Sequence, residues 1–338
     1  MQIQKNFNIR SYNTFGISAS VSDFVSFNDV QSLVTILREH HTRPVYILGG
    51  GSNVLFTKDY EGLLLHNDLK GIKVLKEDEK YYYVKVAAGE PWHSFVTYCV
   101  DQGYGGLENL SLIPGLAGAS PMQNIGAYGV EIKDVFYELE AISIQDQRLH
   151  VFSNADCQFG YRQSIFKTEL KGQFVILSVT YRLLKKPALH LEYGAIREEL
   201  EKAGAAHPTI KDVSDAVIRI RQSKLPDPER IGNAGSFFKN PTIAVTQFEK
   251  IKSAHPALPG YPLPGDATHI KVAAGYLIEA CGWKGYREGD AGVHTRQALV
   301  LVNYGQATGS EIFALSQRII DSVAQKFEIT LEREVNII

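Results

Sequence analysis

Two stretches of the chain combine glycine with uncharged polar residues in a way that suits a large, planar, polar ligand. The first is the turn Gly49-Gly50-Gly51-Ser52-Asn53, and the second runs from residue 105 to residue 129. Glycine permits positive φ and close approach of a ligand, and an uncharged irregular backbone needs partners for its N–H and C=O groups. A bulky cofactor would supply such partners to both stretches. A buried structural loop and a tight structural turn are the alternatives.

Other catalytic chemistries lack their characteristic residues. The histidines show no H-E-x-x-H or other short metal-ligand spacing, and no G-x-S-x-G motif surrounds Ser52 or Ser236. The glycine turn lacks the third glycine of G-x-G-x-x-G, and no Gly-Lys-Ser/Thr of a P-loop follows it. We therefore expect neither a metal centre nor serine acyl transfer nor phosphoryl transfer.

The composition is that of an ordinary globular protein. Its 338 residues are 44% hydrophobic and 21% charged, which is enough chain for two or three domains. The net charge of −2 gives no electrostatic reason to expect nucleic acid or a membrane surface as a partner. No signal-peptide pattern and no apolar run long enough to span a membrane is evident, so we expect a cytoplasmic protein. The three scattered cysteines (Cys99, Cys157 and Cys281) predict reduced thiols.

Periodicity predicts the elements that must position the two glycine-rich stretches. Strands are expected at residues 24–27, 45–48, 63–66, 72–76, 81–87, 137–145, 148–152, 174–184, 298–302 and 329–335. Helices are expected after a cap at Asn28 or Asp29 and at residues 92–101, 211–223, 274–281 and 310–327. The prolines between residues 256 and 264 predict a rigid surface loop, and the break at residues 225–230 predicts a domain boundary.

Six motifs occur along the whole chain in one order and spacing. They are residues 13–16 (NTFG), 48–56 (LGGGSNVLF), 109–115 (NLSLIPG), 123–129 (QNIGAYG), 159–162 (FGYR) and 232–241 (GNAGSFFKNP). Together they resemble the UDP-N-acetylenolpyruvoylglucosamine reductase family of flavoenzymes. No single motif is specific enough to carry that resemblance, but the full set covers the chain from end to end.

The resemblance implies an α+β fold with an FAD-binding region of the vanillyl-alcohol-oxidase type in two subdomains and a separate substrate-binding domain. The implied boundaries are residues 1–70, joined by a C-terminal strand at 328–338, then 71–225 and 226–327. Some relatives in the wider fold anchor flavin through a His or Cys in the glycine turn, where this chain has Ser52 and Asn53. FAD is therefore expected to be non-covalent, with NADPH as the hydride donor.

The same resemblance assigns the residues of the site. The FAD-binding residues it implies are Gly49, Gly50, Gly51, Ser52, Asn53, Asn109, Ser111, Ile113, Pro114, Gly115, Ala119, Ser120, Gln123, Asn124, Gly126, Ala127, Tyr128 and Arg221. The implied catalytic residues are Ser236, as proton donor, with Arg162 and Glu334 around the substrate carboxylate. The implied UDP-sugar contacts are Tyr161, Tyr193, Lys224, Asn240 and Gln297, and Tyr193 indicates the form of the family that has a loop closing over substrate.

Each of these residues also has a structural interpretation when it is taken alone. Arg162 would be an exposed loop cation, Lys224 a charge at a helix C-terminus, Ser236 a turn residue and Tyr193 a core residue. Two other functions remain open: an oxygen-dependent flavoenzyme of the same fold that oxidises a sugar or phenolic alcohol, and a non-enzymatic nucleotide-sugar binding protein. The expected partners are the UDP-sugar and NADPH, without nucleic acid or membrane, and the chain is expected to be a monomer.

Overall fold

The computed structural model describes residues 2–40 and 43–338 and divides the chain into two compact units, each discontinuous in sequence. Unit 1 comprises Met1–Phe7, Val21–Gly50 and Glu61–Ser223. Unit 2 comprises Asn8–Ser20, Gly51–Tyr60 and Lys224–Ile338. Both units contain helices and strands, as the sequence predicts for an α+β protein. The subdivision at residue 70 within the first unit stays a prediction.

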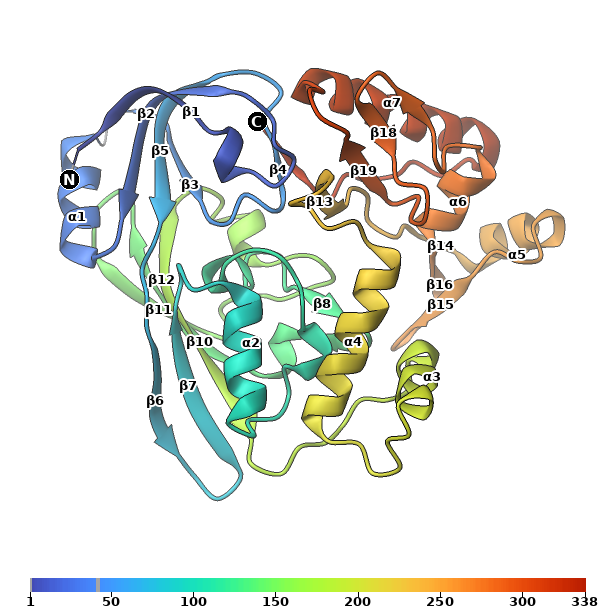
Figure 1. The fold of residues 1–338 in the computed structure, drawn as a ribbon, viewed down its shortest axis with the longest axis horizontal. Helices are drawn as coiled ribbons and strands as arrows, with labels where there is room; N and C mark the ends of the chain where they lie inside the picture. The colour runs from blue at the N-terminus through green and yellow to red at the C-terminus, as the bar shows by residue number, and fades with distance from the viewer. Residues whose placement is uncertain (1, 41–42) are drawn as a thin grey trace. The chain divides into compact units, whose positions relative to one another are not determined.

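The first sheet of unit 1 is covered by one amphipathic helix (Figure 1). Its strands, in spatial order, are β1 (Gln4–Asn8), β2 (Ser20–Phe27), β5 (Tyr60–Asn67) and β3 (Val45–Leu48), with β3 parallel to β5. The helix α1 (Val30–Glu39) begins at Asp29, whose side chain accepts a hydrogen bond from the backbone N–H of Ser32 at 2.8 Å. Its buried Leu33 and Leu37 pack with Phe27 of the sheet. The predicted cap and helix are therefore confirmed.

The second sheet of unit 1 is antiparallel and carries the helix that leads into the glycine-rich loop. Its order is β11 (Leu149–Ser153), β10 (Phe136–Ser143), β12 (Phe174–Leu184), β7 (Tyr81–Ala87) and β6 (Ile72–Glu77). The helix α2 (Trp92–Asp101) has the bounds that the sequence predicts, because Pro91 forms its N-cap and Gly103, with φ of +76°, follows its C-cap. Trp92 and Phe95 of this helix pack against Tyr181 of β12 in the core.

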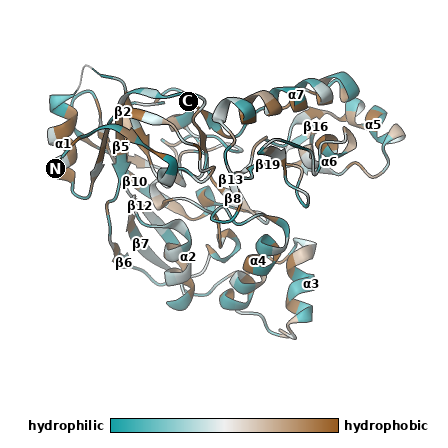
Figure 2. Cartoon of the chain, turned by 45° about the horizontal axis from the view of Figure 1, so that its top comes forward, coloured by the Kyte–Doolittle hydropathy of each residue, from teal (hydrophilic) through white to brown (hydrophobic). Residues whose placement is uncertain are grey.

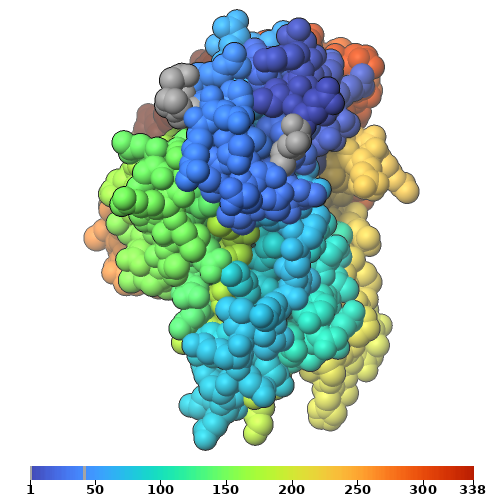
Figure 3. Space-filling model, turned by 90° about the vertical axis from the view of Figure 1, so that its left-hand side faces the viewer, coloured from blue at the N-terminus to red at the C-terminus, as the bar shows by residue number. Residues whose placement is uncertain are grey.

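The two sheets of unit 1 share a hydrophobic core. Val175 and Leu177 of β12 join the cluster formed by α1 and its sheet. In Figure 3 the blue atoms of the N-terminal part of the chain lie against green atoms of its middle part, on the face that the view shows. A smaller cluster pairs α3 (Gly194–Lys202) with α4 (Ile210–Lys224) through residues such as Leu200 and Val217. This pairing fixes the end of α4, from which two candidate site residues project.

Unit 2 is built on two small antiparallel sheets and three helices. The first sheet has the order β13 (Gly232–Ser236), β19 (Val300–Asn303), β18 (Ala291–Val293) and β17 (Arg287–Glu288). The second has the order β14 (Thr242–Ala244), β16 (Asp266–Val272) and β15 (Gly260–Leu263). In addition, β20 (Asn336–Ile337) pairs in parallel with β4 (Val54–Leu55). The helices are α5 (Val245–Ala254), α6 (Ala274–Ala280) and α7 (Gly309–Phe327). A Thr308–Glu311 capping box begins α7, and Figure 2 shows its hydrophobic and hydrophilic residues alternating along the helix.

Three sequence expectations in unit 2 need correction. Residues 260–263 form β15 rather than a loop, because an edge strand tolerates Pro262 where a central strand would lose a ladder hydrogen bond. Most of residues 329–335 are not a regular strand, since this segment pairs with its neighbour only through the isolated bridge between Phe238 and Arg333. Ser236, expected in a glycine-flanked turn, ends β13, where a register shift and Gly235 (φ +68°) break the ladder.

Two features concern the chain as a whole. Within the described ranges, no helix is long and apolar enough to cross a membrane. The cysteines carry free thiols, with Cys99 and Cys157 buried, as expected for reduced residues.

Candidate active site

The glycine-rich loop of unit 1 is tied to the segment that leads into α2. The backbone N–H of Ala117 bonds to the carbonyl of Glu90 at 2.8 Å, and that of Gly118 bonds to the carbonyl of Ala88 at 2.9 Å. The N–H of Trp92 bonds to the carbonyl of Gly115 at 2.9 Å. An irregular loop without charged side chains is therefore held in one conformation by main-chain hydrogen bonds.

The two glycine-rich stretches lie side by side, as a shared ligand would require. A Cβ added to Gly50 would lie 3.0 Å from the Cα of Gly115, and one added to Gly49 would lie 3.8 Å from Leu116. Among the described residues, no acceptor is found for the backbone N–H of Gly49 or for that of Gly50. Gly51, the third glycine of the turn, belongs to unit 2, where its φ is +60° and the N–H of Thr14 bonds to its carbonyl.

Backbone strain is concentrated around the loop. Among the described residues, Leu112, Asn124, Tyr128 and Arg162 all have a positive φ, between +46° and +58°, although none is glycine. Such conformations persist when the surroundings hold them, and they cluster at ligand sites. All four residues are in or next to sequence motifs on which the family resemblance rests.

Several polar side chains that the resemblance assigns to FAD are engaged by the protein instead. Ser111 donates to the carbonyl of Glu108 and pairs with Ser214 at 2.7 Å. Ser120 donates to the carbonyl of Ala117 at 2.7 Å and pairs with the Tyr181 hydroxyl. Their side chains therefore stabilise the loop, which leaves backbone atoms as the part of these residues available to a ligand.

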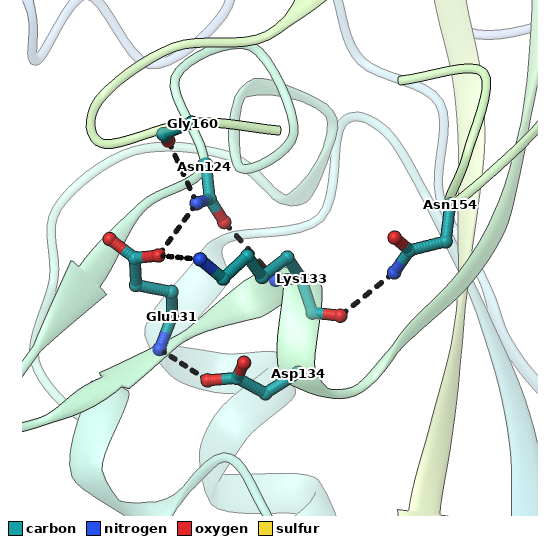
Figure 4. Close-up of polar contacts among 6 residues, drawn as sticks. All are labelled: Asn124, Glu131, Lys133, Asp134, Asn154 and Gly160. Carbon is teal, nitrogen blue, oxygen red and sulfur yellow. Dashed lines mark hydrogen bonds and ion pairs between the residues drawn. The ribbon is translucent and has the colours of Figure 1, made fainter. Parts of the chain in front are cut away.

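Asn124 braces the loop that carries Arg162 (Figure 4). Its Nδ2 donates to Glu131 and to the carbonyl of Gly160, both at 3.0 Å, and its Oδ1 accepts from the N–H of Lys133 at 3.1 Å. These bonds join the hairpin of β8 (Gly126–Ala127) and β9 (Val130–Glu131) to the Gly160 turn. Asn124 was predicted as a cofactor residue, and its amide is filled by protein partners.

Two arginines lie at this hairpin. Arg162 donates from Nη2 to the carbonyl of Gly126 at 2.7 Å, and its guanidinium lies 5.4 Å from the centre of the Tyr161 ring. Arg221, from α4, donates from Nε to the carbonyl of Leu112 at 3.1 Å. Burial lowers the pKa of Arg221, and it raises the pKa of Tyr128, whose hydroxyl Arg221 faces. The structure therefore gathers two guanidinium groups beside this hairpin.

Tyr193, the N-cap residue of α3, contacts Tyr128 of this hairpin. Tyr193 is 46% exposed, and its ring meets Tyr128 edge to face, with the ring centres 5.2 Å apart. A half-exposed aromatic ring of this kind is not the buried core residue that the structural interpretation would require.

In unit 2 the structure brings the irregular segment that carries Glu334 next to the end of β13, where Ser236 lies. The N–H of Glu334 bonds to the carbonyl of Phe237 at 2.8 Å, next to Ser236, which itself pairs with Val300 of β19. Asn53 of the glycine turn also belongs to unit 2, and its Nδ2 donates to the carbonyl of Glu334 at 3.4 Å. Two of the three candidate catalytic residues are therefore neighbours, whereas Arg162 belongs to the other unit.

The remaining candidate substrate residues of unit 2 lie before β19, at the start of α6 and at the end of α4. Gln297 precedes β19, and its Oε1 accepts from the N–H of Leu299 at 3.3 Å. The Oδ1 of Asn240 accepts from the N–H of Ala274 at 3.0 Å, at the start of α6. Lys224 is the exposed last residue of α4. Asn240 therefore also has a structural task, and Lys224 is accessible to a ligand.

The other predicted FAD residues lie in the same two stretches and differ in exposure. Pro114 and Ala119 are exposed, while Ser52, Ile113, Gln123, Gly126 and Ala127 are half-buried. Gln123 accepts a hydrogen bond from Lys167 at 3.4 Å. No group of three or more potential metal ligands is found among the described residues.

Comparisons with known proteins place the chain. The family model for the UDP-N-acetylenolpyruvoylglucosamine reductase C-terminal domain matches residues 227–338, and that for an FAD binding domain matches residues 24–152. The reductase of Flavobacterium johnsoniae is 52% identical over 100% of both chains. That of Chromobacterium violaceum is 48% identical over 99% of this chain and 98% of its own. The chain belongs to the UDP-N-acetylenolpyruvoylglucosamine reductase family.

A solved structure supports the fold. The reductase of Thermus caldophilus, 24% identical, matches 100% of this chain and 99% of its own with a TM-score of 0.68. The predicted fold class is confirmed by this similarity and by the two domain matches. The enzyme class and FAD as the cofactor, both predicted from the motifs, are confirmed by the same matches.

The residues of this family member fit a flavin at the paired glycine stretches. Gly50 approaches Gly115 so closely that a side chain at Gly50 would press on the facing backbone. Asn109 is buried and donates to the carbonyls of Tyr128 and His190, but its Oδ1 has no partner among the described residues. A buried acceptor without a donor is costly, so a donor supplied by a ligand would satisfy it.

One residue near the loop was missed by the sequence reasoning. The ring Nδ1 of His93, in the first turn of α2, accepts a hydrogen bond from the N–H of Leu112 at 3.0 Å. No motif marks this histidine, because its importance comes from a contact with a residue nineteen positions away. Only its place directly after Pro91 and Trp92, next to the helix start, is visible in the sequence.

Proposed function

We propose that this chain catalyses the NADPH-dependent reduction of the enolpyruvyl group of UDP-N-acetylglucosamine enolpyruvate, giving UDP-N-acetylmuramate for peptidoglycan precursor synthesis. The observation that carries the proposal is the identity of about half of all residues with curated reductases over the full length of the chain. The proposal makes the enzyme a cytoplasmic monomer that holds FAD without a covalent bond.

The reaction adds a hydride to the methylene carbon of the enolpyruvyl group and a proton to the adjacent carbon. The hydride would come from FAD, held without a covalent bond and reduced by NADPH. The protein must therefore stabilise the negative charge that develops on the substrate carboxylate and provide the proton.

Three residues have roles in this step. Arg162 places its guanidinium at the substrate carboxylate as negative charge builds up, and Glu334 contacts the same end of the substrate. The hydroxyl of Ser236 donates the proton to the carbon next to the carboxylate. Support comes from unit 2, where a main-chain hydrogen bond from the N–H of Glu334 to the carbonyl of Phe237 holds Glu334 beside the residue that follows Ser236.

Five further residues are assigned to the UDP-sugar. The ammonium of Lys224 would pair with the diphosphate, and Tyr193 would cover the bound nucleotide from the start of α3. Tyr161, Asn240 and Gln297 complete the proposed contacts. The accessibility of Lys224 and the half-exposed ring of Tyr193 support these assignments.

The experiment is a turnover assay on the purified protein, preceded by its visible spectrum. We expect a flavin spectrum that is lost on denaturation and filtration, NADPH consumption that depends on the enolpyruvyl substrate, and a product two mass units heavier. A protein that cannot be loaded with FAD would overturn the proposal. Rapid reoxidation by air coupled to alcohol oxidation would instead favour an oxidase.

A further inference from the structure

Two residues in the first turn of α2 form hydrogen bonds with three residues of the glycine-rich loop. The indole Nε1 of Trp92 donates to the carbonyl of Leu110 at 2.9 Å, and its backbone N–H donates to the carbonyl of Gly115. Between them, the Nδ1 of His93 accepts from the N–H of Leu112 at 3.0 Å. We call this arrangement of Trp92 and His93 on the loop the α2 clamp.

Leu112 is the residue on which two elements converge. Its N–H is held by His93 of α2, and its carbonyl is held by Arg221 of α4 at 3.1 Å. Its φ of +58° lies in the left-handed region, which a leucine occupies only when its surroundings impose it. The contact of His93 with Leu112 therefore also bears on the orientation of Arg221.

The hydrogen bond requires a neutral imidazole. An Nδ1 that accepts a hydrogen bond carries a lone pair, so the ring proton must be on Nε2. Arg221 of α4 is the charged group that faces His93, and burial and this guanidinium together lower the pKa of His93. His93 is therefore a neutral acceptor near neutral pH.

We propose that His93 is a positioning residue for the flavin site, which uses its neutral Nδ1 to hold Leu112 and, through that peptide, the loop at residues 111–115 and the side chain of Arg221. This inference rests on the proposed assignment of that loop and Arg221 to FAD. Protonation of His93 turns the acceptor into a donor that opposes the Leu112 N–H and adds a positive charge beside Arg221. FAD affinity then falls on acidification at pH values below about 6.5, the ordinary histidine pKa, because burial and Arg221 hold the pKa of His93 below that value.

The test compares two substitutions of the same residue in protein stripped of FAD and reloaded. His93→Asn keeps an acceptor, since its Oδ1 replaces Nδ1, but cannot titrate, whereas His93→Leu removes the acceptor. The FAD dissociation constant is measured by flavin fluorescence from pH 5.5 to pH 8. His150→Asn and His150→Leu, at an exposed position of β11, are the matched controls.

For the parent and both His150 variants we expect FAD affinity to fall on acidification. His93→Leu should bind FAD about 3- to 10-fold more weakly at neutral pH, as for one lost hydrogen bond. His93→Asn should bind within about 2-fold of the parent at neutral pH and lose the acid-dependent part of the weakening.

Parental affinity and pH profile in both His93 variants would overturn the inference. So would equal weakening in both variants with the acid dependence retained, because that pattern reports a purely steric role. Turnover of the enolpyruvyl substrate by the parent enzyme is measured in parallel. If the unmodified enzyme binds FAD but does not convert the enolpyruvyl substrate, the proposed function is wrong, while the assignment of His93 is unaffected.

Discussion

Ser111, Ser120 and Asn124 show what a motif-based prediction can and cannot distinguish at the scale of single residues. Their types and spacing carry the resemblance to flavin-binding relatives, yet their side chains are saturated by protein partners. A sequence motif records that a residue type is needed, but a ligand contact and a loop brace need the same polar atoms. The sequence predicted that these residues belong to the loop of the site. It could not predict that their side chains bond to the protein and so brace the loop.

Ser236→Ala should separate the two half-reactions, because its proton is needed only after the hydride has been transferred to substrate. The variant should bind FAD and accept hydride from NADPH at nearly the parental rate. Oxidation of the reduced enzyme by the enolpyruvyl substrate should slow by at least ~10²–10⁴-fold, the usual range for losing a general acid. Stopped-flow absorbance of the flavin follows each half separately.

Ser236→Cys is the matched control for this experiment. A thiol still carries a proton to donate, so its rate should fall between those of the parent and the alanine variant. Slowed reduction by NADPH together with unimpaired oxidation by substrate would show that Ser236 is not the proton donor.

Lys224→Ala tests charge recognition at the end of α4. If its ammonium meets the substrate diphosphate, the variant should bind UDP-sugar about 10- to 100-fold more weakly, as expected when a hydrogen bond to a charged group is lost. Its flavin spectrum should not change. Titration calorimetry with UDP-N-acetylglucosamine is the measurement, and Lys211→Ala, in the first turn of the same helix, is the control. Equal affinity in all three proteins would leave Lys224 as a helix-end charge.

At the scale of elements, local signals predicted most of the structure that positions the site. The bounds of α2 were predictable because Pro91 and Gly103 bracket it, and β3 because an apolar run ends in glycines. By contrast, the sequence pattern predicts neither α3 nor α5, and its prolines predict a loop where β15 lies. Mean hydropathy is low in α3, and Pro262 opposes a strand at β15, so tertiary packing and edge position decide both.

Trp92→Phe tests whether the α2 clamp stabilises the loop independently of cofactor. The phenyl ring keeps much of the aromatic packing against Phe95 and Tyr181 but cannot donate to the carbonyl of Leu110. Trp92 is 1% exposed, so that carbonyl should lose its donor in a buried place, and the free energy of unfolding should fall by about 1–3 kcal/mol. Urea denaturation of FAD-free protein measures it.

Tyr98→Phe, another aromatic-to-phenylalanine change on the same helix, provides the reference for Trp92→Phe. Tyr98 is half-buried, and its expected effect is within about 0.5 kcal/mol. If the two variants unfold at the same urea concentration, the indole hydrogen bond contributes nothing to the stability of the loop.

At the scale of the whole molecule, each of the two units is assembled from segments that are far apart in the sequence. No local signal in the sequence reveals this assembly. Unit 2 is completed by residues 8–20 and 51–60, which are far from its main segment in sequence. Phe15 and Leu55, both fully buried, join its core beside Phe237. The Nδ2 of Asn303 donates to the carbonyl of Phe15 at 2.9 Å. Sequence similarity begins this domain at residue 227, but its hydrophobic core does not begin there.

A fragment of residues 227–338 should therefore fail to fold cooperatively on its own. It lacks the buried Phe15 and Leu55, and β20 loses its parallel partner β4. Differential scanning calorimetry should show no sharp transition for the fragment. In the intact chain, Phe15→Ala should lower the free energy of unfolding by about 3–5 kcal/mol, as for a large aromatic core residue. A sharp melting transition with native near-ultraviolet circular dichroism in the fragment, together with a mild effect of Phe15→Ala, would show that residues 227–338 fold without the two N-terminal segments.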